Sequence, residues 1–509
     1  MSAPGSSPAL RGAALHGLRW ASLSRPATEI AQLGAMIALA HLLVPAAFGR
    51  YAVALIAQEA ALILVSSGLG AALVQRAALR REHLSSAAAL ALLGGAALAG
   101  LMILLSYVVI EPLFDPTTAL YVRLLAPLCL ISALGAVPSA MLGRRLRFRR
   151  LSEIEFTSAL CRAGTSLAFA LAGTGGESLI FGSIAAGTCC TLFALASVRP
   201  PLPRLERAAT RELLRGALPI SASAIGWIGF SNIDYAIVGA RLGALQAGLY
   251  FRAYTLSVEY QKKLSVVLAQ VGFPVFARSS DIQEMIALRR ALLRFFSLAI
   301  FPSLALLAIY APTIVPIVFG ARWAPAATPA AILTLGGAAT LGIDAVGAAL
   351  MASSANADLL RFGVGHFLVY GAAVALAVPF GIVAVAAAAS TVHVLFLLIA
   401  YRLLGARSGE AALRGLAHDL GPAASAALAM LVVSVPLRHL LAAAHLPAVA
   451  IIIAAGLLAA GTYFATLALA FPASTRAVRS LLGELLRRPS SPGSPLGRRP
   501  ELANYAESP

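Results

Sequence analysis

The two lysines of the chain stand side by side, at Lys262 and Lys263, in the largely apolar stretch SVEYQKKLSVV. All the remaining residues among the 39 Lys and Arg residues are arginines. An ionisable side chain at the middle of a bilayer costs about 2.5–3.5 kcal/mol on insertion scales, so such residues usually face a cavity or a partner. If this apolar stretch lies in a membrane, the two ammonium groups indicate a hydrated place that attracts an anion.

Acidic residues lie close enough along the sequence to pair with some of these cations. Glu259 precedes Lys263 by four residues, the favourable order for an ion pair within a helix. Lys262 then lies about 100° further around the helix, and one carboxylate cannot neutralise both lysines. Arg25 and Glu29 are also four residues apart and share one face of the first expected helix, so they could form a similar ion pair. Either pair could instead be a closed ion pair that only holds helices together.

Other polar side chains also fall inside apolar runs, mostly in the first, second, seventh and eighth expected helices. These helices would be equivalent pairs in two halves of the chain, so we expect a cavity between the halves. Arg252 lies nearer a helix end and is expected at the membrane interface. The candidates for a cationic, substrate-binding wall are Arg25, Arg162, Lys262 and Lys263. The candidates for ion coupling or a polar wall are Glu29, Glu59, Asn232, Asp234, Glu259 and Asp344.

No residue pattern indicates catalysis, a metal or a cofactor. The four cysteines lie in apolar runs without zinc or disulfide spacing, and the eight histidines show no metal-ligand spacing. GTGGE at 174–178 matches neither a phosphate-binding loop nor a dinucleotide fingerprint, so we interpret it as a turn. We therefore expect no catalytic residues, no metal and no cofactor, and a protein that is not an enzyme.

The elements that must position these residues are membrane-spanning helices. Of the 509 residues, 60% are hydrophobic and 12% charged, against about 25% charged residues in soluble domains. Long Ala- and Leu-rich runs without alternation favour helices over a β-barrel. We expect an all-α polytopic membrane protein with about fourteen transmembrane helices. Their expected limits are 20–43, 51–74, 86–110, 118–141, 152–173, 177–197, 214–240, 246–275, 292–319, 326–352, 360–379, 381–403, 418–439 and 446–472.

The arginines predict the orientation of these helices. Most fall in one set of alternate connections, including GRRLRFRR at 143–150 and the basic link at 199–215. The positive-inside rule therefore predicts that both termini are cytoplasmic. Because this distribution accounts for most of the formal net charge of +18, nucleic acid is not expected as a partner.

A weak internal repeat predicts two parallel halves. FGRYAVA at 48–54 resembles AGLYFRA at 247–253, which pairs Gly49 with Gly248, unless chance similarity in an Ala-rich chain explains the match. Such a repeat predicts two six-helix bundles related by a pseudo-two-fold axis along the membrane normal. The expected organisation is a cytoplasmic segment at 1–19, bundles at 20–198 and 214–404 joined by a basic cytoplasmic linker at 199–213, two additional helices at 405–472, and a disordered cytoplasmic tail at 473–509.

Several segments carry a resemblance to a known family. The chain resembles the Wzx-type oligosaccharide flippases of polysaccharide biosynthesis, in the multidrug/oligosaccharidyl-lipid/polysaccharide exporter superfamily. The resemblance extends over most of residues 15–405. It rests on LLVPAAFGRYAVA (42–54), SSGLGAALVQR (66–76), LGRRLRFRR (142–150), SNIDYAIVGARLGALQAGLYFRAYTL (231–256) and FPVFAR (273–278).

The resemblance implies alternating access around a central cationic cavity in the bacterial inner membrane, with Arg25, Lys262 and Lys263 as the basic cavity residues. It implies that a polyprenyl-diphosphate-linked oligosaccharide moves from the cytoplasmic to the periplasmic leaflet, for a surface polysaccharide such as O-antigen, capsule or exopolysaccharide. A polysaccharide polymerase and chain-length proteins are the implied protein partners, beside the lipid bilayer.

Three alternatives stay open. A cation-coupled multidrug antiporter of the same superfamily would prefer acidic or aromatic walls, which two mid-membrane lysines disfavour. A membrane-embedded polysaccharide polymerase or ligase would need a large periplasmic loop, whereas the expected outward loops are short. A scaffolding protein would have no evident need for buried charge.

Overall fold

The computed structural model describes residues 28–76, 78–145, 147–259, 261–262, 282–353, 356–443 and 448–472. Within these ranges the chain is helical and contains no strand. Short π- and 3₁₀-helical turns interrupt the helices at η1 (Ser106–Ile110), η2 (Thr255–Glu259), η3 (Ala321–Ala326) and η4 (Val378–Phe380). After the helix Thr28–Leu42, the α-helices are α2 (Pro45–Gln75), α3 (Arg81–Leu105), α4 (Glu111–Leu113), α5 (Pro116–Leu125), α6 (Pro127–Arg144), α7 (Phe148–Leu171), α8 (Glu177–Ser197), α9 (Arg207–Tyr254), α11 (Ile282–Phe319), α12 (Ala327–Ala352), α13 (Asn356–Ala377), α14 (Ile382–Ser408), α15 (Ala412–Ala443) and α16 (Ala448–Ala470).

These helices make the chain a multi-pass membrane protein. In the described residues, nine helical segments are long and apolar enough to cross a membrane. In chain order, the fourteen predicted helices correspond to the helix Thr28–Leu42, α2, α3, α5 with α6, α7, α8, the two parts of α9, and α11 to α16. The predicted all-α membrane fold is therefore confirmed.

Two glycines mark divisions between helices that hydropathy alone hardly separates. Gly243 has φ +80° and breaks α9 between the predicted helices 214–240 and 246–275. Gly381 has φ +91° and separates α13 from α14, where only the tripeptide PFG interrupts the apolar run. Because residues with a Cβ rarely adopt such φ values, these glycines fix where the chain turns.

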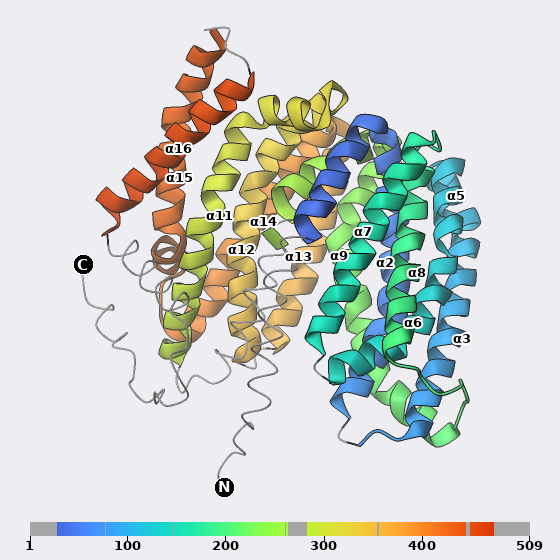
Figure 1. The fold of residues 1–509 in the computed structure, drawn as a ribbon. Coiled ribbons are helices and arrows are strands. Elements are labelled where there is room, and N and C mark those ends of the chain that lie inside the picture. Colours follow the sequence, from blue (N-terminus) through green and yellow to red (C-terminus); the bar gives the residue numbers. More distant parts are fainter. Residues whose placement is uncertain are drawn as a thin grey trace, which may run out of the picture.

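The helices form two groups that face each other (Figure 1). Helices α3 and α5–α8 lie in one group and α11–α16 in the other, while α2 packs along α9 between them. Helix α15 packs on α11 and α14, and α16 packs on α15 and α11. The last two helices therefore lie at the outer edge of the second group.

Helices α2 and α9 cross at two glycines that the predicted repeat pairs with each other. A Cβ on Gly49 would clash with the carbonyl oxygen of Ala244, and a Cβ on Gly248 would clash with the carbonyl oxygen of Pro45. The two clashes are reciprocal, since the same offset relates Gly49 to Gly248 and Pro45 to Ala244. Reciprocal contact between positions that the repeat makes equivalent is what the predicted pseudo-two-fold axis would produce at this crossing.

Arg252, which is expected at the membrane interface, is fully buried in protein beside this crossing. Its guanidinium carbon lies 4.7 Å from the ring centroid of Phe48 and 4.8 Å from those of Phe319 and Trp323. The indole Nε1 of Trp323 donates to the carbonyl oxygen of Ala40 at 3.0 Å. Aromatic faces attract a cation strongly when water is excluded, which offsets part of the cost of burying the charge.

A buried ionic network joins α15 to the second group of helices. Arg289 and Arg290 of α11 each donate to a carboxylate oxygen of Asp419, at 2.6 and 2.8 Å. Tyr401 of α14 donates to Asp419 at 2.7 Å, and Arg290 also pairs with Glu410 at 2.8 Å. Removing one member of such a network would leave a buried charge uncompensated, so the network fixes the place of α15.

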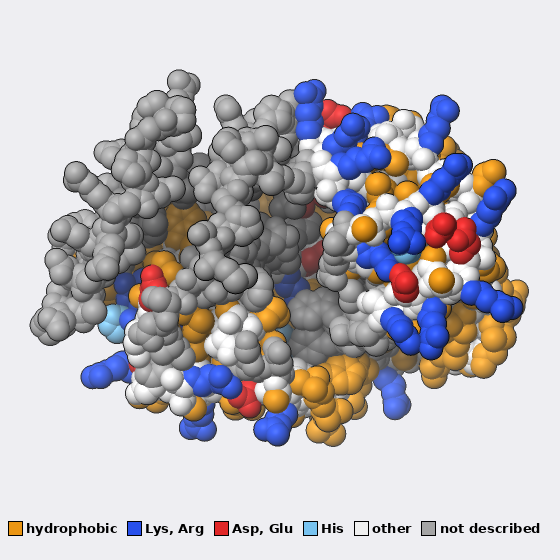
Figure 2. All heavy atoms as spheres, turned by 90° about the horizontal axis from the view of Figure 1, so that it is seen from below, with side chains coloured by type: hydrophobic (Ala, Val, Ile, Leu, Met, Phe, Trp, Pro, Cys, Tyr) orange, Lys and Arg blue, Asp and Glu red, His pale blue; other side chains and the backbone are white. Residues whose placement is uncertain are grey.

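One face of the molecule carries many basic side chains. Figure 2 shows Lys and Arg side chains gathered over the part of this face where α2 passes into α3, and a hollow between the two groups of helices. Arg144 Nη1 donates to the carbonyl oxygens of Leu73 and Val74, at 2.9 and 3.1 Å, near the C-terminal end of α2. A cation there also interacts favourably with the helix dipole.

Candidate functional site

Lys262 lies beyond α9 and follows the last residue of the π turn η2, Glu259, by three positions. Its Nζ donates to the hydroxyl oxygen of Tyr254 at 2.6 Å and lies 5.0 Å from the centroid of the same ring. The lysine is half-buried, whereas Tyr254 is buried. The partner of this ammonium is therefore a neutral hydroxyl, which leaves the positive charge uncancelled by the contact.

Asp234 is the fully buried carboxylate of the same region. Its Oδ2 accepts hydrogen bonds from the hydroxyls of Tyr250 at 3.0 Å and Tyr370 at 2.8 Å. Its Oδ1 accepts from the backbone N–H of Tyr235 at 3.0 Å. Hydrogen bonds to a carboxylate stabilise its charged form, so these donors offset part of the cost of removing Asp234 from water.

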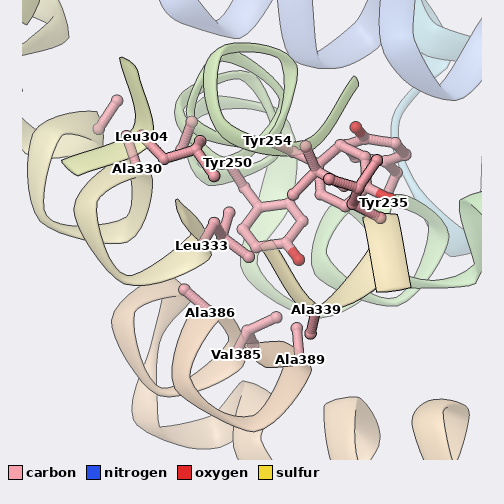
Figure 3. Packing of buried hydrophobic residues seen from close by; sticks show 14 of the residues in the cluster. Tyr235, Tyr250, Tyr254, Leu304, Ala330, Leu333, Ala339, Val385, Ala386 and Ala389 are labelled. Carbon is pink, nitrogen blue, oxygen red and sulfur yellow. The ribbon is translucent and has the colours of Figure 1, made fainter. Parts of the chain in front are cut away.

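The tyrosines around Asp234 form a compact group within the second half of the molecule. Tyr235 packs edge-on against Tyr250 and Tyr254, with ring centroids 5.8 and 5.2 Å apart. Figure 3 shows these three rings gathered beside small side chains of α12 and α14, among them Ala339 and Ala389. The small neighbours leave room for the rings, and the edge-on contacts fix their orientation.

Six of the predicted site residues interact electrostatically through Lys262 or Glu59. Lys262 interacts electrostatically with Asp234 and Asp344. Glu59 of α2 interacts electrostatically with Lys262, with Glu259 and with Arg162 of α7. Glu59 and Arg162 lie before the basic link at 199–215 and the other residues after it, so these interactions connect the two parts of the sequence. We call Glu59, Arg162, Asp234, Glu259, Lys262 and Asp344 the central cluster.

Four predicted residues remain, of which the structure describes two. Arg25 and Lys263 lie outside the described residues. Glu29 is half-buried on the helix Thr28–Leu42, and Asn232 is half-buried on α9.

A pair of histidines that sequence analysis had given no role lies beside the tyrosine group. His366 of α13 stacks on Phe396 of α14, with ring centroids 4.4 Å apart. His393 lies edge-on to Tyr370 at 5.2 Å, and its Nδ1 donates to the carbonyl oxygen of Ala389 at 2.7 Å. Both rings are buried among aromatic neighbours, so they pack within the core.

The central cluster does not resemble a metal centre. Across the residues that the structure describes, no three His, Cys, Asp or Glu side chains are close enough together to hold a metal ion. Within the described residues the cluster combines two cations, Arg162 and Lys262, with four carboxylates, so it offers partners to polar ligand groups of either charge.

Comparisons with known proteins agree with this arrangement. Residues 38–328 match a family described as polysaccharide biosynthesis protein. The chain is 24% identical, over 362 residues, to an uncharacterized membrane protein in the cps region of Klebsiella pneumoniae, covering 70% of this chain and 74% of that protein. It is 25% identical, over 382 residues, to the teichuronic acid biosynthesis protein TuaB of Bacillus subtilis strain 168, covering 74% of this chain and 78% of TuaB.

Among solved structures, the chain is similar to the lipid II flippase MurJ in an inward closed conformation. The TM-score is 0.66 at 13% sequence identity, and the match covers 88% of this chain and 99% of MurJ. At this identity the likeness shows a shared fold.

Proposed function

This chain belongs to the polysaccharide biosynthesis protein family, and from that premise we propose that it is a flippase for polyprenyl-diphosphate-linked oligosaccharides in the bacterial cytoplasmic membrane. The observation that carries the proposal is Lys262, an ammonium within the helical bundle that has a neutral partner and lies among charges from both halves. The sugars and diphosphate of such a lipid could not cross hydrocarbon unaided, because burying unpaired polar groups and charges is too costly.

In this mechanism Lys262 and Lys263 bind the diphosphate, and Arg25 and Arg162 extend the cationic wall. The carboxylates of Glu29, Glu59, Asp234, Glu259 and Asp344, with the Asn232 amide, line the rest of the cavity or couple transport to an ion. The polyprenyl tail stays in the lipid while the headgroup crosses. The surface polysaccharide would be completed by a polymerase and chain-length proteins.

Alternating access requires that one end of the cavity closes while the other opens. The glycine crossing and the buried Arg252 lie at the end that the arginine distribution assigns to the periplasm. The face with many basic side chains would then be cytoplasmic, and its hollow would be the entrance for the headgroup. Two bundles at 20–198 and 214–404, with the helices of 405–472 beside the second, would rock against each other about this crossing.

A cation-coupled antiporter of the same superfamily is the alternative function. The carboxylates of the central cluster could attract a cationic drug, whereas Lys262 would repel it. The two functions therefore differ in the sign of the charge that the substrate carries. The test below separates them through the lipid that accumulates when the protein is absent.

The experiment is complementation of a strain that lacks the gene. We expect the deletion to accumulate a lipid-linked oligosaccharide on the cytoplasmic leaflet and to lose the surface polysaccharide. The wild-type gene should restore the polysaccharide, and Lys262→Ala combined with Lys263→Ala should not, at equal protein level. Arg361→Ala is the matched control, because it removes an exposed positive charge whose side chain is 83% accessible. Full restoration by the double variant would contradict the assigned role of the lysines.

A further inference from the structure

Lys262 meets Tyr254, eight residues earlier in the chain, although a regular helix would not bring these side chains together. Eight residues of an α-helix rotate by about 800°, which leaves the two side chains roughly 80° apart. Between them lies the π turn η2 (Thr255–Glu259). A π turn holds about one residue more than an α turn, so five such residues remove roughly 90° of rotation. The π turn thus brings Tyr254 and Lys262 onto one face.

The π turn is held by specific contacts with α12 and with the residues that follow. Ser257 Oγ donates to the carbonyl oxygen of Ala330 at 2.6 Å. Gln261 Nε2 donates to the carbonyl oxygen of Ser257 at 2.8 Å, and a Cβ on Gly337 would clash with that same oxygen. Carbonyl groups that a π turn releases inside a membrane need another partner, which Gln261 supplies here. The absent side chain at Gly337 lets α12 approach, so packing stabilises the turn.

Tyr254 holds the ammonium in place without cancelling its charge. A lysine has three N–H donors, and the hydrogen bond to the Tyr254 hydroxyl uses one of them. A free lysine side chain loses much rotamer entropy when a ligand orders it, and ordering it beforehand removes that cost from binding. The Tyr254 ring is itself fixed by the edge-on contact with Tyr235, which Figure 3 shows. A carboxylate in place of the hydroxyl would fix the lysine but would also neutralise it.

We propose that Tyr254 is a positioning residue: through the register of the π turn it holds Lys262 Nζ ready to bind the diphosphate of the lipid headgroup. The proposal rests on the function proposed above. Tyr254 would change the affinity for an anion, and this effect would depend entirely on Lys262.

The test measures binding of a polyprenyl diphosphate to the purified full-length protein in detergent micelles. Tyr254→Phe should raise the Kd about five- to tenfold, the change expected when binding itself must order one lysine side chain. In transport assays it should raise KM and leave the maximal rate within about twofold, because the lysine itself remains. Tyr463→Phe is the matched control, since it also removes a buried tyrosine hydroxyl, one that donates to Leu298 at 3.1 Å. The control should leave Kd and KM unchanged.

A double-mutant cycle separates positioning from a merely structural role. Lys262→Met should weaken binding strongly, and adding Tyr254→Phe to it should weaken binding no further. An unchanged Kd in Tyr254→Phe, or equal effects with and without Lys262, would overturn the proposal and leave the proposed function intact. If wild-type protein fails to bind the polyprenyl diphosphate, or Lys262→Met binds it as well as wild type, both proposals are wrong.

Discussion

Asp115 illustrates how one carboxylate can join two helices in the connection between membrane spans. It caps the N-terminus of α5 by accepting from the N–H and the hydroxyl of Thr118, at 2.9 and 2.7 Å. It also accepts from Arg50 Nε of α2 at 3.3 Å. Burial alone would raise the pKa of Asp115, but the bonds from Thr118 and the charge of Arg50 lower that pKa below its usual value.

A depressed pKa predicts a stabilising contribution that is lost in acid. Asp115→Asn should retain most of the cap but lose the ion pair with Arg50, at a cost of about 0.2–1 kcal/mol for a solvent-accessible pair. Because the folded pKa is lowered, this contribution is present above the unfolded pKa of about 3.9 and disappears as pH falls through the folded value. The Tm difference between wild type and variant should be constant from about pH 7 to 5 and shrink below about pH 4. A difference that grows on acidification would contradict this account.

Arg252 should stabilise the packing beside the crossing of α2 and α9 through its charge as well as its size. Arg252→Met keeps much of the side-chain volume but removes the cation from between Phe48, Phe319 and Trp323, and Arg252→Lys keeps a cation without the planar group. We expect the Tm to fall in the order wild type, Arg252→Lys, Arg252→Met. The methionine variant should lose about 2 kcal/mol or more in free energy of unfolding, because a desolvated cation–π contact is worth about that much. A methionine variant as stable as wild type would show that the rings only need an apolar neighbour.

At the level of residues, sequence reasoning found the charges and missed their partners. Glu59, Arg162 and Lys262 could be predicted because a charge in an apolar run is costly and therefore informative. Tyr250, Tyr254 and Tyr370 could not, because a tyrosine in an apolar run has the composition of an ordinary core residue. The aromatic surroundings of Arg252 could not be predicted either, because its distance from a helix end says nothing about residues that arrive from α2, α11 and η3.

At the level of elements, the crossing of α2 and α9 depends on glycine at both contact positions. An added methyl group on Gly49 or Gly248 would overlap backbone atoms of the opposite helix, which cannot move aside as a flexible side chain would. The helices would have to separate, and with them the two halves at this end.

Gly49→Ala and Gly248→Ala should each lower the free energy of unfolding by about 1–3 kcal/mol, the usual cost of overpacking. Gly70→Ala is the control on the same helix, because its added Cβ would meet open space, and it should be neutral or slightly stabilising. The Tm of the purified proteins measures the effect. Equal stability of Gly49→Ala and Gly70→Ala would show that the helices are not in close contact here.

The helices themselves were largely predictable, because long apolar runs in a membrane protein leave the backbone few alternatives. The break at Gly243 and the division at Gly381 also followed from the sequence, since both fall at short interruptions. The π turn at Thr255–Glu259 could not be predicted, because its stabilising contacts come from Ala330 and Gly337 on α12, remote in the sequence. The sequence therefore predicted a regular helix through Lys262 and did not predict that its side chain meets Tyr254.

At the level of the whole molecule, two groups of helices meet at a tight crossing, while the opposite face is basic and hollowed between them (Figures 1 and 2). The central cluster brings together charges from both sides of the basic link, while the apolar core also runs through both parts. Charged groups can exchange partners when the two parts separate, whereas apolar surface would have to be exposed to water. This division suits a carrier whose halves part around a charged ligand and stay together at one end.

The most direct test of the central claim is lipid translocation by the purified protein in liposomes. A fluorescent polyprenyl-diphosphate-linked sugar should move between leaflets faster in these vesicles than in protein-free vesicles, and a labelled lipid without the diphosphate should not. Replacing Lys262 and Lys263 together with alanine should reduce the protein-dependent rate at least tenfold, about 1.4 kcal/mol or more in barrier height. Translocation no faster than in empty vesicles, or equally fast with the alanine variant, would contradict a cationic cavity that carries the diphosphate headgroup.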